Sequence, residues 1–367
     1  MTKNSDEFRV VLVHTPCSEL EDDRLEPPLG LLYLATILEK NGIDCTICDL
    51  SGYSSDQWQS ELSKAGHANV YGFSTYSVTY FRTLSIKRLA EGLNPNALFV
   101  AGGPHASAMP KETSEQFDVV IRGEAEEIFL DTVRKFCANR IKPIAPMILQ
   151  GISVKSLDDL PFPDYGLVDL KSYRRIVDGE SSISLLTSRG CSYNCTFCNS
   201  LTFMRGVLRF RSPQNVVNEI VQLMEMYGTH TFRFNDDLFT FSRERIREMT
   251  KALTPLNIRY RVFARSNTMT VEASKQLAAS GCKHVAIGIE SMSRDMLRLM
   301  DKRTTVEENI AALFNCKAAG LAVRIYLLIG FPGETEATVN ESLRILMDCP
   351  FDEFVVYAFI PYPGTAV

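Results

Sequence analysis

Three cysteines at the end of a predicted strand are the residues of this 367-residue chain best suited to chemistry. Cys191, Cys195 and Cys198 are spaced C-x3-C-x2-C and follow the β-like run 182–187. Three thiolates in so short a loop can hold a [4Fe–4S] cluster and leave one iron without a protein ligand. An open iron is a place where a small molecule binds and reacts. The spacing therefore predicts a reactive iron–sulfur site.

Two other interpretations of the same cysteines remain open at this point. A structural zinc site takes four ligands, commonly from two CxxC-type pairs, and no histidine close to the loop in sequence completes such a set. Three ordinary reduced cysteines would need no particular spacing. We favour the iron–sulfur interpretation because polar residues also follow the later strands of the chain, as described below.

The cysteine spacing, with Phe197 beside the last cysteine, resembles the signature of the radical S-adenosylmethionine (SAM) enzymes. The resemblance implies a [4Fe–4S] cluster on Cys191, Cys195 and Cys198 whose open iron binds the amino and carboxylate groups of SAM. It also implies that the reduced cluster cleaves SAM to methionine and a 5′-deoxyadenosyl radical. An external electron donor such as flavodoxin or ferredoxin is the partner that such a cluster requires.

The overall composition is that of a globular protein, with 45% hydrophobic and 23% charged residues. A net charge of −5 creates no basic field, so we expect no nucleic-acid partner. No apolar run approaches the roughly 20 residues of a membrane span, and the N-terminus shows no signal-peptide core. Ten cysteines without an export signal predict a reducing, cytoplasmic location.

The first half of the chain predicts a ligand-binding domain of its own, because 367 residues exceed a typical single core. Residues 8–140 alternate short apolar strands with helices, which is typical of a doubly wound, Rossmann-like parallel sheet. Ligands of such sheets bind outside the carboxyl ends of the strands. The small or polar residues predicted at those ends are His14, Ser74, Thr75, Gly102, Gly103, His105 and Gly123. Each glycine taken alone is equally well a turn residue.

Three short motifs in this region resemble the cobalamin-binding domain that precedes many radical SAM domains: Pro27–Gly30, Gly102–His105 and Arg122–Glu124. The resemblance adds Gly30 and Glu124 to the candidate cobalamin-binding residues. Many cobalamin domains carry a D-x-H-x-x-G loop whose histidine becomes the lower axial ligand of cobalt. This chain has no such loop, so we assign no axial ligand.

Cys45 and Cys48 form a C-x2-C pair that invites a redox or metal interpretation. The pair lies within a predicted buried strand, where the two-residue period directs positions i and i+3 to opposite faces. We therefore interpret both cysteines as structural.

Proline-rich stretches within residues 141–180 predict a linker, and residues 181–367 predict a second α/β domain. Its six expected strands are 182–187, 230–234, 259–263, 284–289, 323–329 and 353–359. Six β/α units fit an incomplete TIM-like barrel, and the count matches the partial barrel of the radical SAM enzymes. The helix Val216–Tyr227 has Ser212 as a predicted N-cap and Pro213 at its first position. We expect no C-terminal extension after Val367, where members of the family normally continue.

Catalytic groups in such barrels lie at the carboxyl ends of the strands, and polar residues follow several predicted strands here. The candidate SAM-binding residues are Phe197, Asp236, Arg265, Glu290, Ser291 and Gly330. The Arg265 guanidinium suits the SAM carboxylate because it can pair bidentately. Asp236 suits the SAM amino group, although the family often has a glycine-rich acidic stretch where this chain has Asn-Asp-Asp. Individually these residues can also be turn residues or solvated ion pairs, and no catalytic residue is assigned.

Together the resemblances imply a cobalamin-dependent radical SAM enzyme, whose commonest reaction is methyl transfer to an unactivated carbon of a small molecule or peptide. A different radical SAM reaction, such as ring formation, oxidation or rearrangement, is the nearest alternative. A methylthiotransferase needs a second three-cysteine cluster, and Cys17, Cys45 and Cys48 lack its spacing. A non-catalytic cobalamin or iron–sulfur sensor is the alternative from another class of protein.

Overall fold

The chain folds as two compact units in the computed structural model, which describes residues 8–17, 22–204 and 206–367. The first unit contains residues 1–155, 159–174 and 202–205, and the second contains residues 156–158, 175–201 and 206–367. In the described part of the chain, no helix combines the length and the apolar character needed to cross a membrane.

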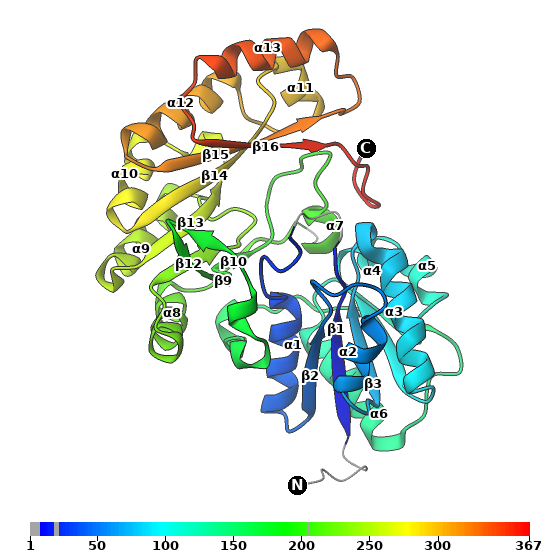
Figure 1. Ribbon diagram of the computed structural model, residues 1–367. Coiled ribbons are helices and arrows are strands. Elements are labelled where there is room, and N and C mark those ends of the chain that lie inside the picture. The colour runs from blue at the N-terminus through cyan, green and yellow to red at the C-terminus, as the bar shows by residue number, and fades with distance from the viewer. Residues whose placement is uncertain (1–7, 18–21, 205) are drawn as a thin grey trace. The chain divides into compact units, whose positions relative to one another are not determined.

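The first unit is built on a six-stranded parallel sheet with the order β2-β1-β3-β4-β5-β6 (Figure 1). The strands are β1 (Arg9–His14), β2 (Asp44–Asp49), β3 (Val70–Ser74), β4 (Leu98–Gly102), β5 (Val119–Arg122) and β6 (Met147–Gln150). The helices are α1 (Leu29–Lys40), α2 (Trp58–Lys64), α3 (Tyr80–Leu93), α4 (Pro104–Ala108), α5 (Pro110–Ser114) and α6 (Glu126–Asn139). The predicted doubly wound sheet is confirmed, and its order reverses at β1, where such folds bind ligands.

Both faces of this sheet are covered, which explains why its strands are almost continuously apolar. On β1, Val11 and Val13 belong to the core under α2 and α3, whereas Val10 and Leu12 belong to the core under α1 and α6. The same alternation separates the two cysteines of β2, because Cys45 lies in one core and Cys48 in the other. Burial raises the pKa of Cys48 to about 12 and that of Cys45 further. The structural interpretation of this pair is confirmed.

The strand β6 at the edge of this sheet differs from the sequence prediction, which places residues 141–180 in a linker. β6 pairs in parallel with β5 at the edge of the sheet. Met147 and Ile148 are both exposed, whereas Leu149 packs against the core of the first unit. An edge strand of this kind lacks the buried apolar run by which the other strands are recognised.

The second unit contains a six-stranded parallel sheet with the order β16-β15-β14-β13-β12-β9 (Figure 1). Each of these six strands therefore pairs with the next strand of the same sheet along the chain. These strands are β9 (Ile183–Leu185), β12 (Thr231–Phe234), β13 (Arg259–Ala264), β14 (Cys282–Glu290), β15 (Ala322–Ile329) and β16 (Glu353–Ala358). The short strands are β7 (Ile176–Val177), β8 (Glu180–Ser181), β10 (Ser188–Arg189) and β11 (Arg209–Phe210). All six predicted strands are present, and the incomplete barrel is confirmed.

Helices alternate with the strands of this partial barrel. They are α8 (Pro213–Tyr227), α9 (Arg243–Leu253), α10 (Val271–Ala279), α11 (Arg294–Leu299), α12 (Val306–Ala318) and α13 (Glu336–Met347). The short helix α7 (Ser200–Met204) follows the cysteines, and its residues 202–204 belong to the first unit. The predicted start of α8 is confirmed, because the Ser212 side chain accepts a hydrogen bond from Asn215 N at 3.1 Å and Pro213 opens the helix. Each strand thus ends in a loop at the edge where such barrels place their active sites.

Candidate functional site

The cysteine loop lies directly after β9, and a small antiparallel ladder closes it. β10, at the start of the cysteine loop, pairs with β11, so the segment that leaves the barrel lies beside the segment that returns to it. Within the loop, Cys198 N donates to Cys195 O at 3.0 Å, and Thr196 N donates to Met300 O at 3.0 Å. Cys195 is buried, whereas Cys191 and Cys198 are partly exposed. The loop is therefore compact and is fixed to the segment that follows α11.

The three thiols are close enough to affect one another electrostatically. Burial raises the pKa of Cys191, and raises that of Cys198 to about 11, and the neighbouring thiols raise both further. Within the described ranges, however, no three His, Cys, Asp or Glu side chains converge on a single ion position. Three thiols within one short loop are a ligand set that could bind three irons of a [4Fe–4S] cluster, one each.

Arg265, directly after β13, contacts this loop closely. Its Nη1 donates a hydrogen bond to Cys195 Sγ at 3.4 Å, and its guanidinium lies 3.6 Å from the centre of the Tyr193 ring. Asn267 Nδ2 donates to the Tyr193 hydroxyl at 3.1 Å from the same turn. The sequence identified Arg265 but not Tyr193 or Asn267, because only the fold brings them together.

Glu290, at the end of β14, pairs with Lys302 across 2.7 Å, and both side chains are largely buried. Glu290 has φ +63°, and the β14–β15 register shifts beside it. A Cβ on Gly288 would lie 2.5 Å from Glu290 Oε1, so the pair depends on that glycine. A non-glycine residue with a positive φ is strained, and such strained residues are concentrated at functional sites. Lys302 Nζ also lies 5.8 Å from the centre of the Phe197 ring, next to the cysteines.

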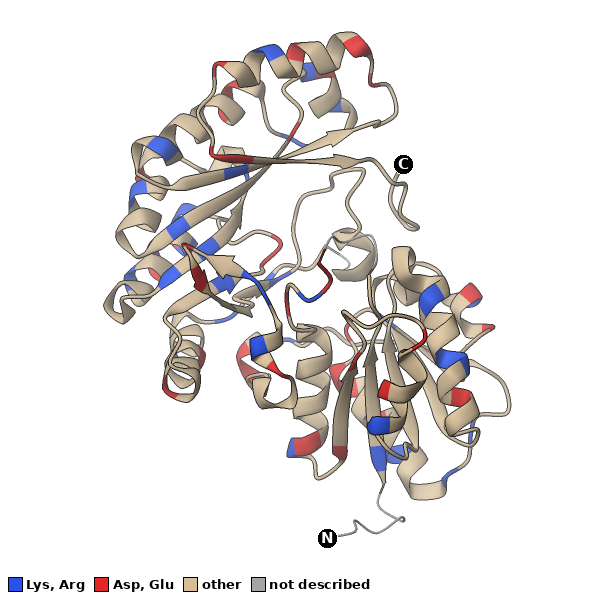
Figure 2. Cartoon of the chain, in the orientation of Figure 1, with Lys and Arg blue, Asp and Glu red and all other residues tan. Residues whose placement is uncertain are grey.

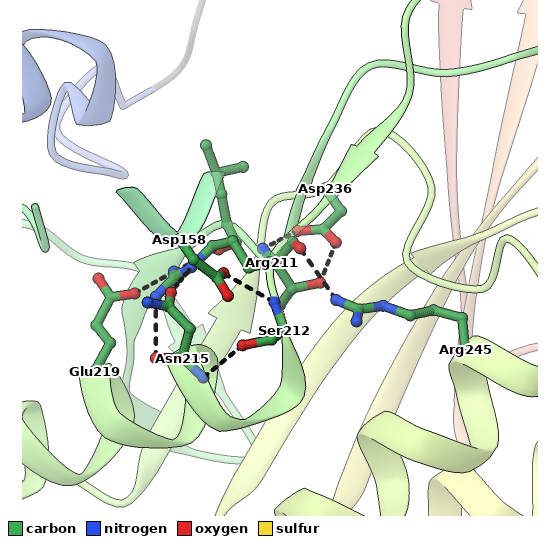
Figure 3. Close-up of polar contacts among 9 residues, drawn as sticks. Asp158, Arg211, Ser212, Asn215, Glu219, Asp236 and Arg245 are labelled. Atoms are coloured by element: carbon green, nitrogen blue, oxygen red, sulfur yellow. Dashed lines mark hydrogen bonds and ion pairs between the residues drawn. The ribbon is translucent and has the colours of Figure 1, made fainter. Parts of the chain in front are cut away.

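Asp236 is buried beside Thr187 and Ser188, where the cysteine loop begins, at 1% exposure (Figure 3). Its carboxylate accepts hydrogen bonds from Thr187 N at 2.6 Å, Thr187 Oγ1 at 2.5 Å and Ser188 Oγ at 2.7 Å. Burial raises its pKa, although these hydrogen bonds oppose the shift. Arg245 Nη2 donates to the Thr187 carbonyl at 3.1 Å from the opposite side. Asp236 therefore holds the strand end from which the cysteine loop begins.

The start of α8 supports the same strand end (Figure 3). Arg211 N donates to Thr187 O at 2.9 Å, and Arg211 Nη1 donates to Leu186 O at 2.8 Å and pairs with the buried Glu219. Asp158 Oδ1 accepts a hydrogen bond from Ser212 N at 2.9 Å. Removing one partner of a buried ion pair leaves the other charge without compensation, so this network makes the base of the loop rigid.

Asp237, next in the chain, points the other way and was not among the predicted site residues. Its side chain is exposed, accepts a hydrogen bond from Ser200 Oγ at 2.7 Å, and raises the pKa of Cys191 and Cys198. Of the two aspartates of the Asn-Asp-Asp segment, Asp237 is therefore the one whose charge acts on these two predicted cluster ligands. The sequence could not separate the two aspartates, since neighbouring loop residues have no fixed periodicity.

We expect Asp236→Ala to lower the free energy of unfolding of the apo-protein by about 2–3 kcal/mol, because three buried donors lose their acceptor. The matched change Asp237→Ala removes an exposed carboxylate and should stay within about 0.5 kcal/mol of the wild type. Urea unfolding followed by circular dichroism measures both. Equal effects of the two substitutions would contradict the assignment of Asp236 as the buried support.

Two other predicted SAM-binding residues lie in different surroundings. Ser291 is buried, and its hydroxyl accepts a hydrogen bond from Ser293 N and lies 3.1 Å from Ser342 Oγ on α13. Gly330, after β15, is exposed with φ +79°, and a Cβ there would meet no atom within 4 Å. Gly330 thus leaves open space at its strand end, while Ser291 connects elements of the scaffold.

At the carboxyl edge of the first unit, the loops after β3 and β4 are joined through Thr75. Its Oγ1 donates to Gly102 O at 2.8 Å and accepts from Ala106 N at 3.0 Å. Gly103 has φ +95°, and a Cβ there would lie 2.9 Å from Thr75 O. His105 is buried, with Nδ1 3.0 Å from Ser77 Oγ and its ring 3.9 Å from that of Tyr80. Burial lowers the pKa of His105 and favours the neutral imidazole.

Other predicted residues of this edge make contacts within the unit. His14 lies opposite Asp49 in the β1–β2 register, and Tyr173 donates a hydrogen bond to Asp49. Burial lowers the pKa of His14. Glu124 accepts a hydrogen bond from Val154 N at 3.2 Å, and Gly123 N donates to Ser107 Oγ at 2.8 Å. These contacts shape the edge.

Two glycines leave this edge open. A Cβ on Gly30, in the first turn of α1, would meet no atom within 4 Å, and one on Gly102 would meet only Ile121 O at 3.8 Å. Neither glycine has a positive φ that would exclude a side chain. Neither the backbone conformation nor a neighbouring atom requires glycine at these two positions. A backbone left accessible in this way suits the close approach of a large flat ligand. The edge therefore fits a cofactor such as cobalamin.

Comparison with known proteins agrees with these features. The model of the radical SAM superfamily matches residues 185–346, and that of the B12 binding domain matches residues 23–133. An uncharacterized methyltransferase of Pyrococcus horikoshii is 29% identical over 360 residues, covering 92% of this chain and 77% of that protein. The anaerobic magnesium-protoporphyrin IX monomethyl ester cyclase of Cereibacter sphaeroides is 27% identical over 365 residues, covering 92% of this chain and 59% of that protein.

A solved structure shares the folds found in both units of this chain. It is the radical SAM methyltransferase TsrM of Kitasatospora setae with cobalamin and a [4Fe–4S] cluster bound, with a TM-score of 0.76 and 20% identity over 98% of this chain and 74% of that one. At this identity the likeness concerns the fold. The two matching family models together show that this chain belongs to the radical SAM enzymes with a B12-binding domain, whose cofactors are a [4Fe–4S] cluster, SAM and cobalamin.

Proposed function

We propose that this enzyme is a cobalamin-dependent methyltransferase that acts on an unactivated carbon. The observation that carries the proposal is the three-thiol loop at the carboxyl edge of a partial barrel, in a chain whose other unit matches the B12 binding domain. The relative from Pyrococcus horikoshii, named a methyltransferase, aligns with 92% of this chain and so supports the reaction type.

The protein's part in this reaction is to hold three cofactors in defined places. Cys191, Cys195 and Cys198 would bind three irons of the cluster and leave the fourth for SAM. When bound, the cluster with SAM supplies one-electron chemistry at carbon, and cobalamin supplies a transferable methyl group. The chain's own residues shield and orient these groups.

We propose Phe197, Glu290 and Gly330 as SAM-contacting residues. Phe197 packs against a buried cluster formed by Met296, Met300 and Phe331, so its ring has a fixed position beside the cysteines. Glu290 is held by Lys302 in a strained conformation at the same edge. The predicted contacts of Asp236 and Ser291 with SAM have less support, because their oxygens already bond within the scaffold.

For cobalamin, we propose the edge that Gly30 and Gly102 leave open, with Gly103, Ser74 and Thr75 beside it. The space around Gly30 and Gly102 supports this role. His14, His105, Gly123 and Glu124 shape the surroundings of the edge through the contacts described above. Neither histidine is proposed as an axial ligand of cobalt.

The proposed partners follow from the cofactors. The cluster needs an electron from an external donor, for which flavodoxin or ferredoxin is proposed. The substrate is proposed to be a small molecule or a peptide and not a nucleic acid, because the net charge is −5 and acidic and basic residues lie interspersed on the outer helices of the second unit (Figure 2). We propose the cytoplasm as the location, since reduced cysteines are typical of it.

Product analysis tests the reaction type. The anaerobically reconstituted enzyme, supplied with cobalamin, a reductant and methyl-deuterated SAM, is incubated with a small-molecule extract, and the products are searched by mass. The proposal predicts a product carrying the labelled methyl group, with S-adenosylhomocysteine formed alongside. A product without the label, accompanied by deoxyadenosine alone, would contradict it.

Ring formation is the second candidate. It is favoured by the alignment of a magnesium-protoporphyrin monomethyl ester cyclase with 92% of this chain. The same experiment separates the two reactions, because cyclisation leaves the label in methionine and yields an unlabelled product that has lost hydrogen.

A further inference from the structure

Arg265 has more contacts with the cysteine loop than a SAM-binding residue would need. The side chain is only 6% exposed. Its Nη1 donates to Cys195 Sγ, its Nη2 donates to the Lys302 carbonyl, and its plane lies on the Tyr193 ring. One guanidinium therefore joins a predicted cluster ligand, a loop aromatic and the turn after α11.

Further hydrogen bonds and an ion pair hold the residues around this guanidinium. Thr268 donates two hydrogen bonds to the Arg265 carbonyl, from N at 3.1 Å and Oγ1 at 2.7 Å, which hold the turn after β13. Asn267 holds Tyr193 from the same turn, and Glu290 holds Lys302. A group that is held by packing and hydrogen bonds before the cofactor arrives is preorganised.

The two terminal nitrogens of the guanidinium donate to two different acceptors. Bidentate recognition of a carboxylate needs two parallel N–H donors directed at one group. Here the two terminal nitrogens donate to a sulfur and to a backbone oxygen. An end-on contact with the SAM carboxylate would use these same two nitrogens, whereas Nε is buried and has no acceptor among the described residues.

We propose that Arg265 is a positioning residue that holds Cys195 in its ligating orientation and raises the reduction potential of the bound cluster. The inference rests on the cluster of the proposed function. Reduction adds negative charge to the cluster, and a buried cation that donates to a ligand sulfur stabilises the reduced form. Burial matters because water would otherwise screen the charge.

The holoenzyme tests this with three variants. Arg265→Gln removes the charge, Arg265→Lys keeps the charge without the planar guanidinium, and Arg261→Gln removes another buried arginine, which lies on β13 just before Arg265. Arg261 is 2% exposed and donates to the Tyr326 hydroxyl at 2.9 Å, which makes it a matched control. Iron and sulfide content, a redox titration followed by electron paramagnetic resonance, and SAM affinity are measured for each.

At a fixed ambient potential, we expect Arg265→Gln to lower the ratio of reduced to oxidised cluster about tenfold, which is 59 mV for a one-electron couple. Arg265→Lys should lower it less, and Arg261→Gln should leave it unchanged. SAM affinity should change by less than about twofold, or 0.4 kcal/mol. Loss of the cluster from Arg265→Gln but not from Arg261→Gln would also support the positioning role, and the lysine variant then gives the potential.

An unchanged potential in Arg265→Gln, together with SAM binding weakened more than about tenfold, would overturn the inference and restore the carboxylate-binding role. Equal shifts in Arg265→Gln and Arg261→Gln would overturn it as well. A wild-type protein that holds no iron and sulfide refutes the proposed function itself, and this result is recognised before any variant is made.

Discussion

Replacing Cys191, Cys195 or Cys198 singly by alanine is expected to abolish the cluster and, with it, the cleavage of SAM. The loop offers only three thiolates, and each is the sole protein ligand of one iron in the proposed site. We expect the iron content to fall from about four per chain to below about one after anaerobic reconstitution. Iron and sulfide analysis and the formation of deoxyadenosine measure the two effects.

The chain offers two matched controls for these variants. Cys137 is an exposed free cysteine on α6, and Cys316 is a buried one on α12. Alanine at either position should leave the iron content at the wild-type level. Full iron retention in all three loop variants, or equal loss in the controls, would show that the cysteine loop does not hold the cluster.

Gly30→Tyr is expected to weaken cobalamin binding by at least about tenfold, or 1.4 kcal/mol, without harming the fold. The side chain would enter the open space at the carboxyl edge of the first unit. Helix α1 should tolerate it, because glycine is a poor helix residue and φ at this position is not positive. Cobalamin retained after gel filtration, read from its absorption spectrum, measures the effect.

The control is Gly92→Tyr on α3. Gly92 is also an exposed helical glycine around which a Cβ would meet no atom within 4 Å, but it lies near the C-terminal end of its helix. That end is remote from the carboxyl edge of the sheet, so cobalamin binding should be unchanged. Equal retention by the two variants would remove Gly30 from the proposed binding edge.

The strands could be predicted from the sequence because burial on both faces produces continuous apolar runs. Val10–Val13 of β1 is such a run, and every residue of it is fully buried. β6 was missed for the opposite reason, since two of its apolar residues are exposed at an edge. The helix α8 could be predicted because Ser212 and Pro213 mark its start locally.

The site could be predicted only as far as local spacing reaches. The three cysteines lie within eight residues, so their spacing alone indicated a shared ligand. The contacts of Arg265 with Tyr193 and Lys302 join residues far apart in the chain, and no periodicity records them. The different surroundings of Asp236 and Asp237 depend on which hydroxyl groups the fold places around them.

The most direct test of the central claim is the electron paramagnetic resonance spectrum of the reduced, anaerobically reconstituted protein, recorded with and without SAM. If three cysteines leave one iron of a [4Fe–4S] cluster open, the protein should show the signal of a reduced cluster, and SAM should change that signal by binding to the open iron. A cluster signal that is identical with and without saturating SAM, or no cluster signal at all, would contradict the account.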